Sequence, residues 1–204
     1  MLQVALDLLD KEKCFNICNS IAKYVDLIEA GTPLIKKFGI GIVKELGIFG
    51  DVVADMKTMD AGFLEASMAF ESGAKYTTVL GLASNKTIRE VVRAAKEYGG
   101  KVMGDLIGVK DVNQRGMELL DMGVDVVCIH LGIDEQKEKS LIDILKDVEL
   151  PSKHLAVAGG INLENIDAIL KLKPSIVIVG SAITKADSPL YVAKEMRRRI
   201  YGIP

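Results

Sequence analysis

The chain of 204 residues is long enough for one globular domain with a substantial hydrophobic core. Hydrophobic residues make up 49% of it and charged residues 26%, a composition that excludes an intrinsically disordered protein. The formal charge of −2 argues against a nucleic-acid or anionic-membrane partner, which would need a concentrated basic surface. The longest segment without Asp, Glu, Lys or Arg, 174–184, is too short for a membrane span of about 20 residues. We therefore expect a single domain over residues 1–204, with no nucleic-acid and no membrane partner.

The N-terminus and the cysteines both indicate a cytoplasmic protein. Residues 1–7 have neither the basic start nor the small-residue cleavage site of a signal peptide. The three cysteines, Cys14, Cys18 and Cys128, are an odd number, and disulfides are rare in the cytosol. Because Cys14 and Cys18 stand four residues apart, a helix would place both on one face. We expect buried, reduced thiols and not metal ligands.

Short, apolar and often β-branched runs recur along the chain, with 20 to 30 residues from one start to the next. In chain order they cover residues 4–8, 24–29, 51–57, 76–80, 101–107, 125–130, 155–158 and 176–179. Each run is short for a helix and mostly apolar on both faces, as in a parallel sheet that is covered by helices. The sequence therefore predicts eight parallel strands.

Between these runs lie segments with the start and stop signals of helices. An N-cap residue followed by proline, or the spacing of a capping box, occurs at Thr32-Pro33, Ser188-Pro189 and Asp111-x-x-Gln114. Residues 87–98 carry apolar side chains at helical spacing and end at Gly99-Gly100. A strand followed by a helix, repeated eight times, predicts an α/β protein with a (β/α)8 TIM barrel. An open, doubly wound sheet has the same alternation, but eight units that fill the whole chain favour the closed barrel.

Polar side chains capable of chemistry stand where the expected strands end. They are Asp7, Glu29, Asp55, Lys57, Asp105 and His130. Charged groups in apolar strands are costly unless they are paired or bind a ligand. Because the carboxyl ends of barrel strands converge on one active site, this set favours a functional site over structural ion pairs.

Three chemical roles follow from these residue types. The side chains of Asp55 and Lys57, two residues apart on one strand, should point the same way, into the mouth of the barrel. The carboxylates of Glu29 and Asp55, from adjacent strands, suit Mg²⁺, which takes few protein ligands beside water and substrate oxygens. His130, the last residue of its strand, is a candidate general acid–base, although a lone histidine on an apolar strand is more often structural.

The last two strands end in glycine. Gly159 and Gly160 follow the seventh strand, before a helix expected to begin near residue 162 or 163, and Gly180 and Ser181 follow the eighth. Glycine lets a phosphate approach the backbone, and N–H groups at a helix start can bind it. Loops after strands seven and eight are the common phosphate site of barrel enzymes. These four residues are therefore predicted to bind phosphate, the alternative being glycines that only permit tight turns.

Residues 55–60, Asp-Met-Lys-Thr-Met-Asp, have the pattern D-x-K-x-x-D. This motif resembles that of the orotidine 5′-monophosphate decarboxylase suprafamily of barrels, and the whole chain resembles the 3-hexulose-6-phosphate synthases within it. The matching segments are 2–7, 28–33, 54–62, 78–81, 130–134, 158–161 and 178–184. They extend from the first expected strand to the last.

The resemblance implies an Mg²⁺-dependent aldolase of the ribulose monophosphate pathway. Such an enzyme condenses formaldehyde with D-ribulose 5-phosphate to D-arabino-hex-3-ulose 6-phosphate through an enediolate intermediate. By position, Glu29 and Asp55 would bind the metal, and Lys57 would assist the enediolate oxygens. His130 would transfer the proton, and Asp7 would contact the sugar hydroxyls.

The resemblance also implies a homodimer with shared active sites. In this suprafamily the residue at the position of Asp60 reaches into the site of the neighbouring subunit. Asp60 is therefore expected to act in the partner and not in its own barrel.

Other activities of the suprafamily fit the sequence less well. Orotidine decarboxylases have a lysine where this chain has Glu29, which argues against that reaction. 3-Keto-L-gulonate 6-phosphate decarboxylases share the metal site and the enediolate chemistry, but typically carry arginines near the histidine of strand six and after the glycine of strand eight. Here those positions read Leu-Gly-Ile-Asp at 131–134 and Ser181. The decarboxylase is therefore the second candidate, and a sugar-phosphate-binding protein without turnover is the third.

Overall fold

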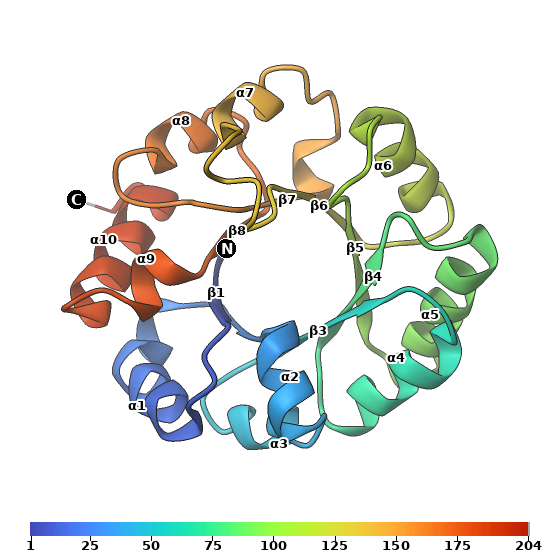
Figure 1. Cartoon of the computed structure of the whole chain (residues 1–204), viewed down its shortest axis with the longest axis horizontal. Coiled ribbons are helices and arrows are strands. Elements are labelled where there is room, and N and C mark those ends of the chain that lie inside the picture. The colour runs from blue at the N-terminus through green and yellow to red at the C-terminus, as the bar shows by residue number, and fades with distance from the viewer. Residues whose placement is uncertain (204) are drawn as a thin grey trace.

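A computed structural model describes residues 1–203 and shows a closed barrel of eight parallel strands (Figure 1). The strands are β1 (Leu2–Leu6), β2 (Leu27–Ala30), β3 (Val52–Thr58), β4 (Tyr76–Leu80), β5 (Lys101–Asp105), β6 (Val126–His130), β7 (Leu155–Ala158) and β8 (Ile176–Val179). Each strand pairs with the next along the chain, and β8 pairs with β1. The predicted TIM barrel is confirmed, because an open sheet would lack this last pairing.

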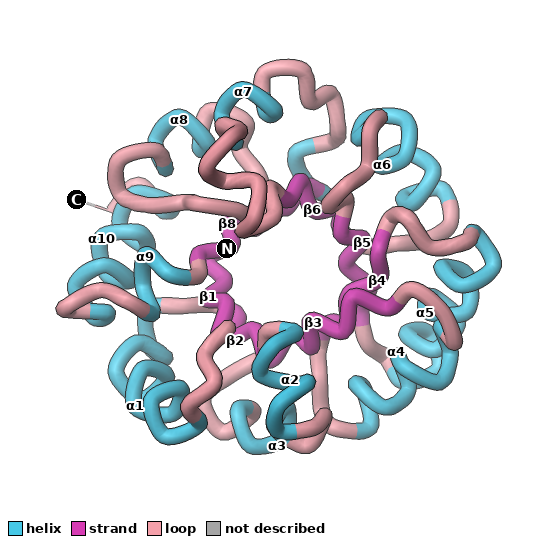
Figure 2. The backbone as a smooth tube through the Cα atoms, viewed as in Figure 1, coloured by secondary structure: helices cyan, strands magenta, loops and turns pink. Residues whose placement is uncertain are grey.

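Helices surround the barrel on the outside (Figure 2). They are α1 (Lys11–Ile21), α2 (Thr32–Phe38), α3 (Ile42–Leu46), α4 (Gly62–Glu71), α5 (Asn85–Tyr98), α6 (Val112–Asp121), α7 (Leu141–Leu145), α8 (Ile166–Leu170), α9 (Ser181–Thr184) and α10 (Pro189–Tyr201). Two short 3₁₀ turns, η1 (Ala22–Tyr24) and η2 (Ser152–His154), precede β2 and β7. The last helix, α10, packs against α1 and so closes the outer ring.

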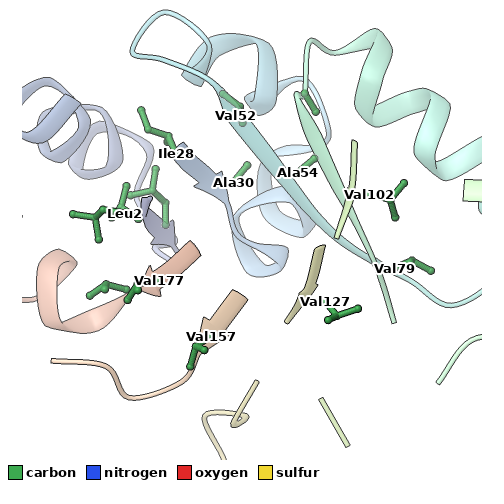
Figure 3. Close-up of a cluster of buried hydrophobic side chains, with 14 of the residues drawn as sticks. Leu2, Ile28, Ala30, Val52, Ala54, Val79, Val102, Val127, Val157 and Val177 are labelled. Atoms are coloured by element: carbon green, nitrogen blue, oxygen red, sulfur yellow. The ribbon is translucent and has the colours of Figure 1, made fainter. Parts of the chain in front are cut away.

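The strands separate two hydrophobic clusters. The larger cluster fills the space between strands and helices, and the side chains labelled in Figure 3 come from all eight strands. The smaller cluster lies inside the barrel and includes Leu27, Tyr76, Met103 and Ile176. Alternate residues of each strand therefore enter different clusters, which explains why the sequence runs are apolar on both faces.

Of the three helix N-caps predicted from the sequence, two are confirmed and one is wrong. Ser188 and Asp111 cap α10 and α6, because each side-chain oxygen accepts a backbone N–H three residues on. Thr32 is not an N-cap, since α2 begins at Thr32 itself and Gly31 precedes it. The Thr32 hydroxyl donates instead to Asp55 on the neighbouring strand, a contact that only the closed barrel provides.

The long helix α5 begins slightly before the predicted 87–98. It starts at Asn85 and ends before Gly99, whose φ of +72° is the left-handed conformation that glycine favours. The capping box expected at Asp111 is incomplete, because the Gln114 side chain donates to Glu118 and not back to the helix start.

All three cysteines are free and buried, as expected. Cys14 and Cys18 lie in α1, and burial raises the pKa values of their thiols to about 11 and about 12. Cys128 lies inside the barrel on β6, where burial raises its pKa as well. Neutral, buried thiols pack as small apolar groups and are poor nucleophiles.

The helices of the outer ring are short or amphipathic. Within residues 1–203, no helix is both long enough and apolar enough to cross a bilayer.

Candidate active site

The carboxyl ends of the strands surround a cavity of about 470 Å³. Nine of the ten site residues named from the sequence line it. They are Asp7, Glu29, Asp55, Lys57, His130, Gly159, Gly160, Gly180 and Ser181. The tenth, Asp60, lies in the exposed turn between β3 and α4. Asp105, at the end of β5, lines the cavity as well.

Asp55, near the end of β3, is held by three neighbouring side chains. Its Oδ1 accepts hydrogen bonds from the Thr78 hydroxyl at 2.8 Å and from Lys57 Nζ at 3.0 Å. Its Oδ2 accepts from the Thr32 hydroxyl at 2.8 Å and again from Lys57 Nζ at 2.8 Å. Each carboxylate oxygen therefore receives two donors, and these fix the plane of the buried group.

A bulge in β3 brings Asp55 and Lys57 together. A register shift between Ala54 and Thr58 makes β3 advance four residues while β4 advances two. Within this bulge Lys57 has a φ of +46°, a left-handed conformation that costs a residue with a side chain about 1–2 kcal/mol. Both side chains line the mouth of the barrel, as predicted. The bulge brings them there, and not the alternation of side chains along a regular strand.

Lys57 also reaches Asp105 at the end of β5, and Asp105 in turn contacts His130 at the end of β6. Its Nζ lies 3.1 Å from Asp105 Oδ2, and His130 Nδ1 lies 2.9 Å from the same oxygen. Burial lowers the pKa of the Lys57 ammonium, but the charges of Asp55 and Asp105 outweigh burial and raise it. Burial raises the pKa of Asp105, and the hydrogen bond and charge of His130 together with the charge of Lys57 lower it overall. The lysine is therefore charged, and Asp105 orients the imidazole so that Nε2 is left for a substrate.

Glu29 and Asp7 bring further negative charge to this side of the cavity. Burial and the charges of Asp55 and Asp7 raise the pKa of Glu29 well above its ordinary value of 4.5. Gln3, on β1, donates from Nε2 to Glu29 Oε2, while its own buried Oε1 has no partner within residues 1–203. Burial and the charge of Asp55 likewise raise the pKa of Asp7. Burial, and after it the repulsion from Asp55, therefore disfavour the ionised forms of both carboxyl groups.

A divalent cation fits this arrangement. Asp7, Glu29, Asp55 and Asp105 all line the cavity, and Lys57 pairs with two of these four carboxylates. Within residues 1–203, no three His, Cys, Asp or Glu side chains are grouped so that they could hold a metal ion by themselves. Mg²⁺ is suited to such a place, because it keeps several waters and needs only one or two carboxylates beside substrate oxygens. Glu29 and Asp55 are the residues that would hold it, and a cation on Asp55 would replace one of its two hydrogen bonds from Lys57.

Across the barrel from β3, the ends of β7 and β8 present backbone to the cavity. Gly159 and Gly160 have φ values of +109° and +65°, which glycine adopts without a steric penalty. A Cβ added at Gly159 would lie 2.3 Å from the Leu131 carbonyl oxygen, so its backbone packs closely on the loop after β6. A Cβ added at Gly180 would meet no atom closer than 3.9 Å, so this part of the cavity is open to a ligand.

The helix expected near residue 162 or 163 begins later. Asn162 Oδ1 accepts from the backbone N–H groups of Glu164 and Asn165, which forms a turn, and α8 starts only at Ile166. The next helix, α9, has only four residues. Exposed loop N–H groups, and not the start of a long helix, are therefore the donors available to a phosphate.

Lys185, directly after α9, places a positive charge at the same end of the cavity. None of the ion pairs formed within residues 1–203 includes this lysine. A cation without a carboxylate partner suits an anionic ligand group.

Several residues that support or line the cavity were not predicted from the sequence, and four of them bear on the site's charges. They are Gln3, Thr32, Thr78 and Lys185. Gln3 carried a usable signal, since an amide in an otherwise apolar strand needs a partner. Thr78 carried none, because threonine is an ordinary β-strand residue.

Asp60 stands apart from the cavity of its own chain. It lies after β3, next to Met59, which is 52% exposed. Leu64 and Met68, one helical turn apart on α4, are also exposed large apolar side chains. These exposed apolar side chains belong to the same stretch of chain as Asp60, which includes the end of β3 and helix α4.

Comparison with known proteins gives the family. Residues 1–196 match the model of the "Orotidine 5′-phosphate decarboxylase / HUMPS family". The chain belongs to this family. A 3-hexulose-6-phosphate synthase of Staphylococcus epidermidis is 39% identical to it, over 98% of this chain and 99% of the relative. A 3-hexulose-6-phosphate synthase of Mycobacterium gastri is 41% identical over the same shares.

Solved structures of this family have the same fold. A crystal structure of 3-hexulose-6-phosphate synthase gives a TM-score of 0.91 at 40% identity, over 98% of this chain and 99% of that chain. A 3-keto-L-gulonate-6-phosphate decarboxylase of Vibrio cholerae gives 0.86 at 29% identity, over 100% and 98%. The predicted suprafamily is confirmed. The relatives, synthases of the aldehyde-lyase type, also confirm the prediction that the chain is an enzyme of that type.

Proposed function

We propose that the protein is a magnesium-dependent aldolase that condenses formaldehyde with D-ribulose 5-phosphate to D-arabino-hex-3-ulose 6-phosphate. The observation that carries this proposal is the network of Asp55, Lys57, Asp105 and His130 in the cavity of a chain whose relatives are named 3-hexulose-6-phosphate synthase. This is the formaldehyde-fixing reaction of the ribulose monophosphate pathway. We propose a cytoplasmic location for the enzyme, because its cysteines are free thiols.

The reaction begins with the loss of a proton from C1 of the ketose. His130 is the base, because Asp105 binds its Nδ1 and thereby leaves Nε2 to take the proton. Negative charge then develops on the two oxygens of an enediolate. The Lys57 ammonium, kept charged by Asp55 and Asp105, donates hydrogen bonds to these oxygens. Mg²⁺ held by Glu29 and Asp55 would supply further electrostatic stabilisation of the same charge.

C1 of the enediolate then attacks formaldehyde. A carbon–carbon bond forms, the π electrons of formaldehyde move to its oxygen, and that oxygen takes the proton back from His130 Nε2. The former C2 carbonyl of ribulose becomes the C3 carbonyl of the hexulose, so all atoms of both substrates are retained. Asp7, at the rim of the cavity, accepts hydrogen bonds from the sugar hydroxyls and orients the chain of carbons.

The phosphate of the substrate binds at the ends of β7 and β8. Backbone N–H groups near Gly159, Gly160, Gly180 and Ser181 donate hydrogen bonds to it, and Lys185 compensates its charge. These contacts, far from the reacting carbon, bind the substrate alike in the ground state and the transition state, and so lower its KM.

Consumption of formaldehyde tests the proposed reaction. With ribulose 5-phosphate and Mg²⁺ present, the protein should consume formaldehyde, and EDTA should stop the reaction until Mg²⁺ is restored. No consumption with pure substrate and metal present would overturn the assignment.

The second candidate is decarboxylation of 3-keto-L-gulonate 6-phosphate, because a decarboxylase of this substrate shares the fold at 29% identity. Against it, residues 131–134 after His130 include no arginine, and Ser181 stands after the glycine of β8. Release of carbon dioxide faster than the aldol reaction would favour the decarboxylase. Tight binding of ribulose 5-phosphate without exchange of its C1 proton into deuterated water would favour a binding protein without turnover.

We also propose a homodimer with shared active sites. It is supported by the position of Asp60, which does not line its own cavity and lies in the chain between Met59 and Leu64, two exposed apolar residues. Asp60→Ala and His130→Ala should each be inactive, and random exchange of subunits should restore up to about a quarter of the wild-type activity, since half of the dimers would be mixed and each would hold one intact site. Failure of the mixture to regain activity after demonstrated exchange would contradict the shared site.

A further inference from the structure

The hydroxyl of Thr78, on β4, is bonded to two groups of β3. It accepts a hydrogen bond from the backbone N–H of Lys57 at 2.8 Å and donates one to Asp55 Oδ1 at 2.8 Å. Thr78 is buried and lines the cavity. One hydroxyl therefore contacts both the backbone of the lysine and the carboxylate with which that lysine pairs.

The bulge explains why a side chain is needed at this point. In a regular parallel ladder, backbone N–H groups donate to carbonyl oxygens of the neighbouring strand. At the register shift the N–H of Lys57 reaches Thr78 Oγ1 instead. A buried N–H without a partner would cost free energy, so the hydroxyl stabilises a conformation that the chain would otherwise avoid.

We propose that Thr78 is a positioning residue for the reaction of this site. Its hydroxyl holds the backbone of Lys57 in the left-handed conformation of the bulge, and it fixes the carboxylate plane of Asp55. Both effects place Lys57 Nζ between the carboxylates of Asp55 and Asp105. The catalytic part of this inference rests on the proposed aldol function, whereas the geometric part concerns only the folded chain.

Thr32 helps to separate the two effects. Its hydroxyl also donates to Asp55, at Oδ2 and at the backbone oxygen, but its hydrogen bonds do not include Lys57. Loss of the Thr32 hydroxyl should therefore disturb only Asp55, at its carboxylate and its backbone oxygen. Loss of the Thr78 hydroxyl should disturb the Asp55 carboxylate and the backbone of Lys57.

Thr77 is a matched control on the same strand. It is fully buried next to Thr78, but its hydroxyl has no hydrogen-bond partner within residues 1–203. Because strand residues alternate, it faces the helices and not the cavity. Valine replaces threonine at nearly constant volume, so Thr77→Val and Thr78→Val both remove a buried hydroxyl, and only the second removes a contact. Thr78→Ser keeps the hydroxyl and loses a methyl group.

The experiment compares the wild type with these variants in three measurements. They are steady-state aldol kinetics, Mn²⁺ affinity by electron paramagnetic resonance, and hydrogen exchange of the Lys57 amide by NMR. Thr78→Val should lower kcat about 10- to 100-fold and weaken Mn²⁺ binding, as loss of a group that orients a metal ligand does. The KM for ribulose 5-phosphate should change less than about threefold, because the phosphate end is untouched.

The Lys57 amide distinguishes positioning from general damage. It should exchange faster in Thr78→Val and at the wild-type rate in Thr32→Val, although Thr32→Val should also weaken Mn²⁺ binding. Thr78→Ser should restore kcat to within about threefold of the wild type, and Thr77→Val should leave all three measurements unchanged.

Several outcomes would overturn the proposal. The proposal is wrong if the kcat of Thr78→Val stays within about twofold of the wild-type value. It is also wrong if Thr78→Ser restores no more kcat than Thr78→Val, or if Thr77→Val loses as much kcat as Thr78→Val. A wild type without aldol activity would overturn the proposed function instead. In that case the exchange rate of the Lys57 amide still decides whether Thr78 holds the lysine, since unchanged exchange in Thr78→Val contradicts it.

Discussion

The cavity has two walls that differ in how they are built. One wall consists of charged side chains from β2, β3, β5 and β6, and Asp55 alone accepts four side-chain hydrogen bonds there. The opposite wall consists of the glycine-rich ends of β7 and β8, where a Cβ at Gly180 would meet only Ala5, at 3.9 Å. The first wall fixes groups in place before a substrate arrives, and the second leaves room for one.

The difference separates two kinds of catalytic contribution. Preorganised charges stabilise charge that develops during a reaction, so their loss lowers kcat. Contacts to a remote group of the substrate act alike in the ground state and the transition state, so their loss raises KM. Substitutions in the two walls should therefore have different kinetic signatures.

Asp55→Asn should have the largest effect. The amide removes the charge that would bind Mg²⁺ and that holds the Lys57 ammonium, so we expect kcat to fall by about 1,000-fold or more. The rate of formaldehyde consumption at saturating ribulose 5-phosphate measures this fall in kcat. Asp51→Asn is the control, because Asp51 precedes the same strand at its other end and forms an exposed pair with Lys75. A near-normal rate and Mg²⁺ dependence in the Asp55→Asn enzyme would contradict the expectation that the charged wall determines kcat.

Lys185→Ala should act on the opposite wall. The lysine lines the cavity near Gly180, so its loss should raise the KM for ribulose 5-phosphate by about tenfold while kcat changes less than about threefold. Inhibition by inorganic phosphate should weaken in parallel. Lys153→Ala, in the 3₁₀ turn at the other end of β7, should change neither quantity. A fall in kcat at constant KM would mean that Lys185 acts in the chemical step and not in phosphate binding.

Gly180→Ala should produce a smaller change of the same kind. Because the methyl group would enter open cavity space, it should hinder the ligand and leave the fold intact, raising KM by about three- to tenfold. Gly41→Ala is the matched control, since a Cβ there has no atom within 4 Å and the residue is remote from the cavity. A wild-type KM in both variants would mean that Gly180 only permits a tight turn and does not make room for the ligand.

The fold could be predicted from the sequence because each strand is covered on both sides. The runs 155–158 and 176–179 match β7 and β8 residue for residue, since all four side chains of each are buried. The run 24–29 began too early, because Tyr24 belongs to a 3₁₀ turn before β2. Apolar composition alone does not distinguish a strand from a tight turn that leads into it.

The site could be predicted only in part. Strand ends converge in any barrel, which brought Asp7, Glu29 and His130 to one cavity. The roles of Thr32 and Thr78 depend on a bulge that no local pattern announces, and a threonine before Pro33 is an equally good helix cap. The role of Asp60 concerns a second copy of the chain, so that assignment remains a prediction.

Glu29→Gln tests the charged wall through stability. Gln3 Nε2 can still donate to the new amide oxygen, and the new amide nitrogen can donate to Gln3 Oε1, which has no partner within residues 1–203. In the absence of metal and above neutral pH, we expect the variant to be more stable than the wild type by about 1–3 kcal/mol. Urea unfolding in EDTA measures the difference, and Glu45→Gln, at an exposed pair with Lys11, should show none.

The pH dependence of this difference follows from the raised pKa of Glu29. Below the ordinary value of 4.5 the carboxyl is protonated in both the folded and the unfolded chain, so wild type and variant should be equally stable. As pH rises from there towards the folded pKa, the unfolded chain releases a proton that the folded chain keeps. The wild type then loses about 1.4 kcal/mol per pH unit relative to the variant, and the loss ends above the folded pKa. Mg²⁺ should reverse it, because a bound cation favours the ionised carboxylate. Parallel stability curves with and without Mg²⁺ would mean that the charged wall compensates its own charge, and the reason for placing a metal there would disappear.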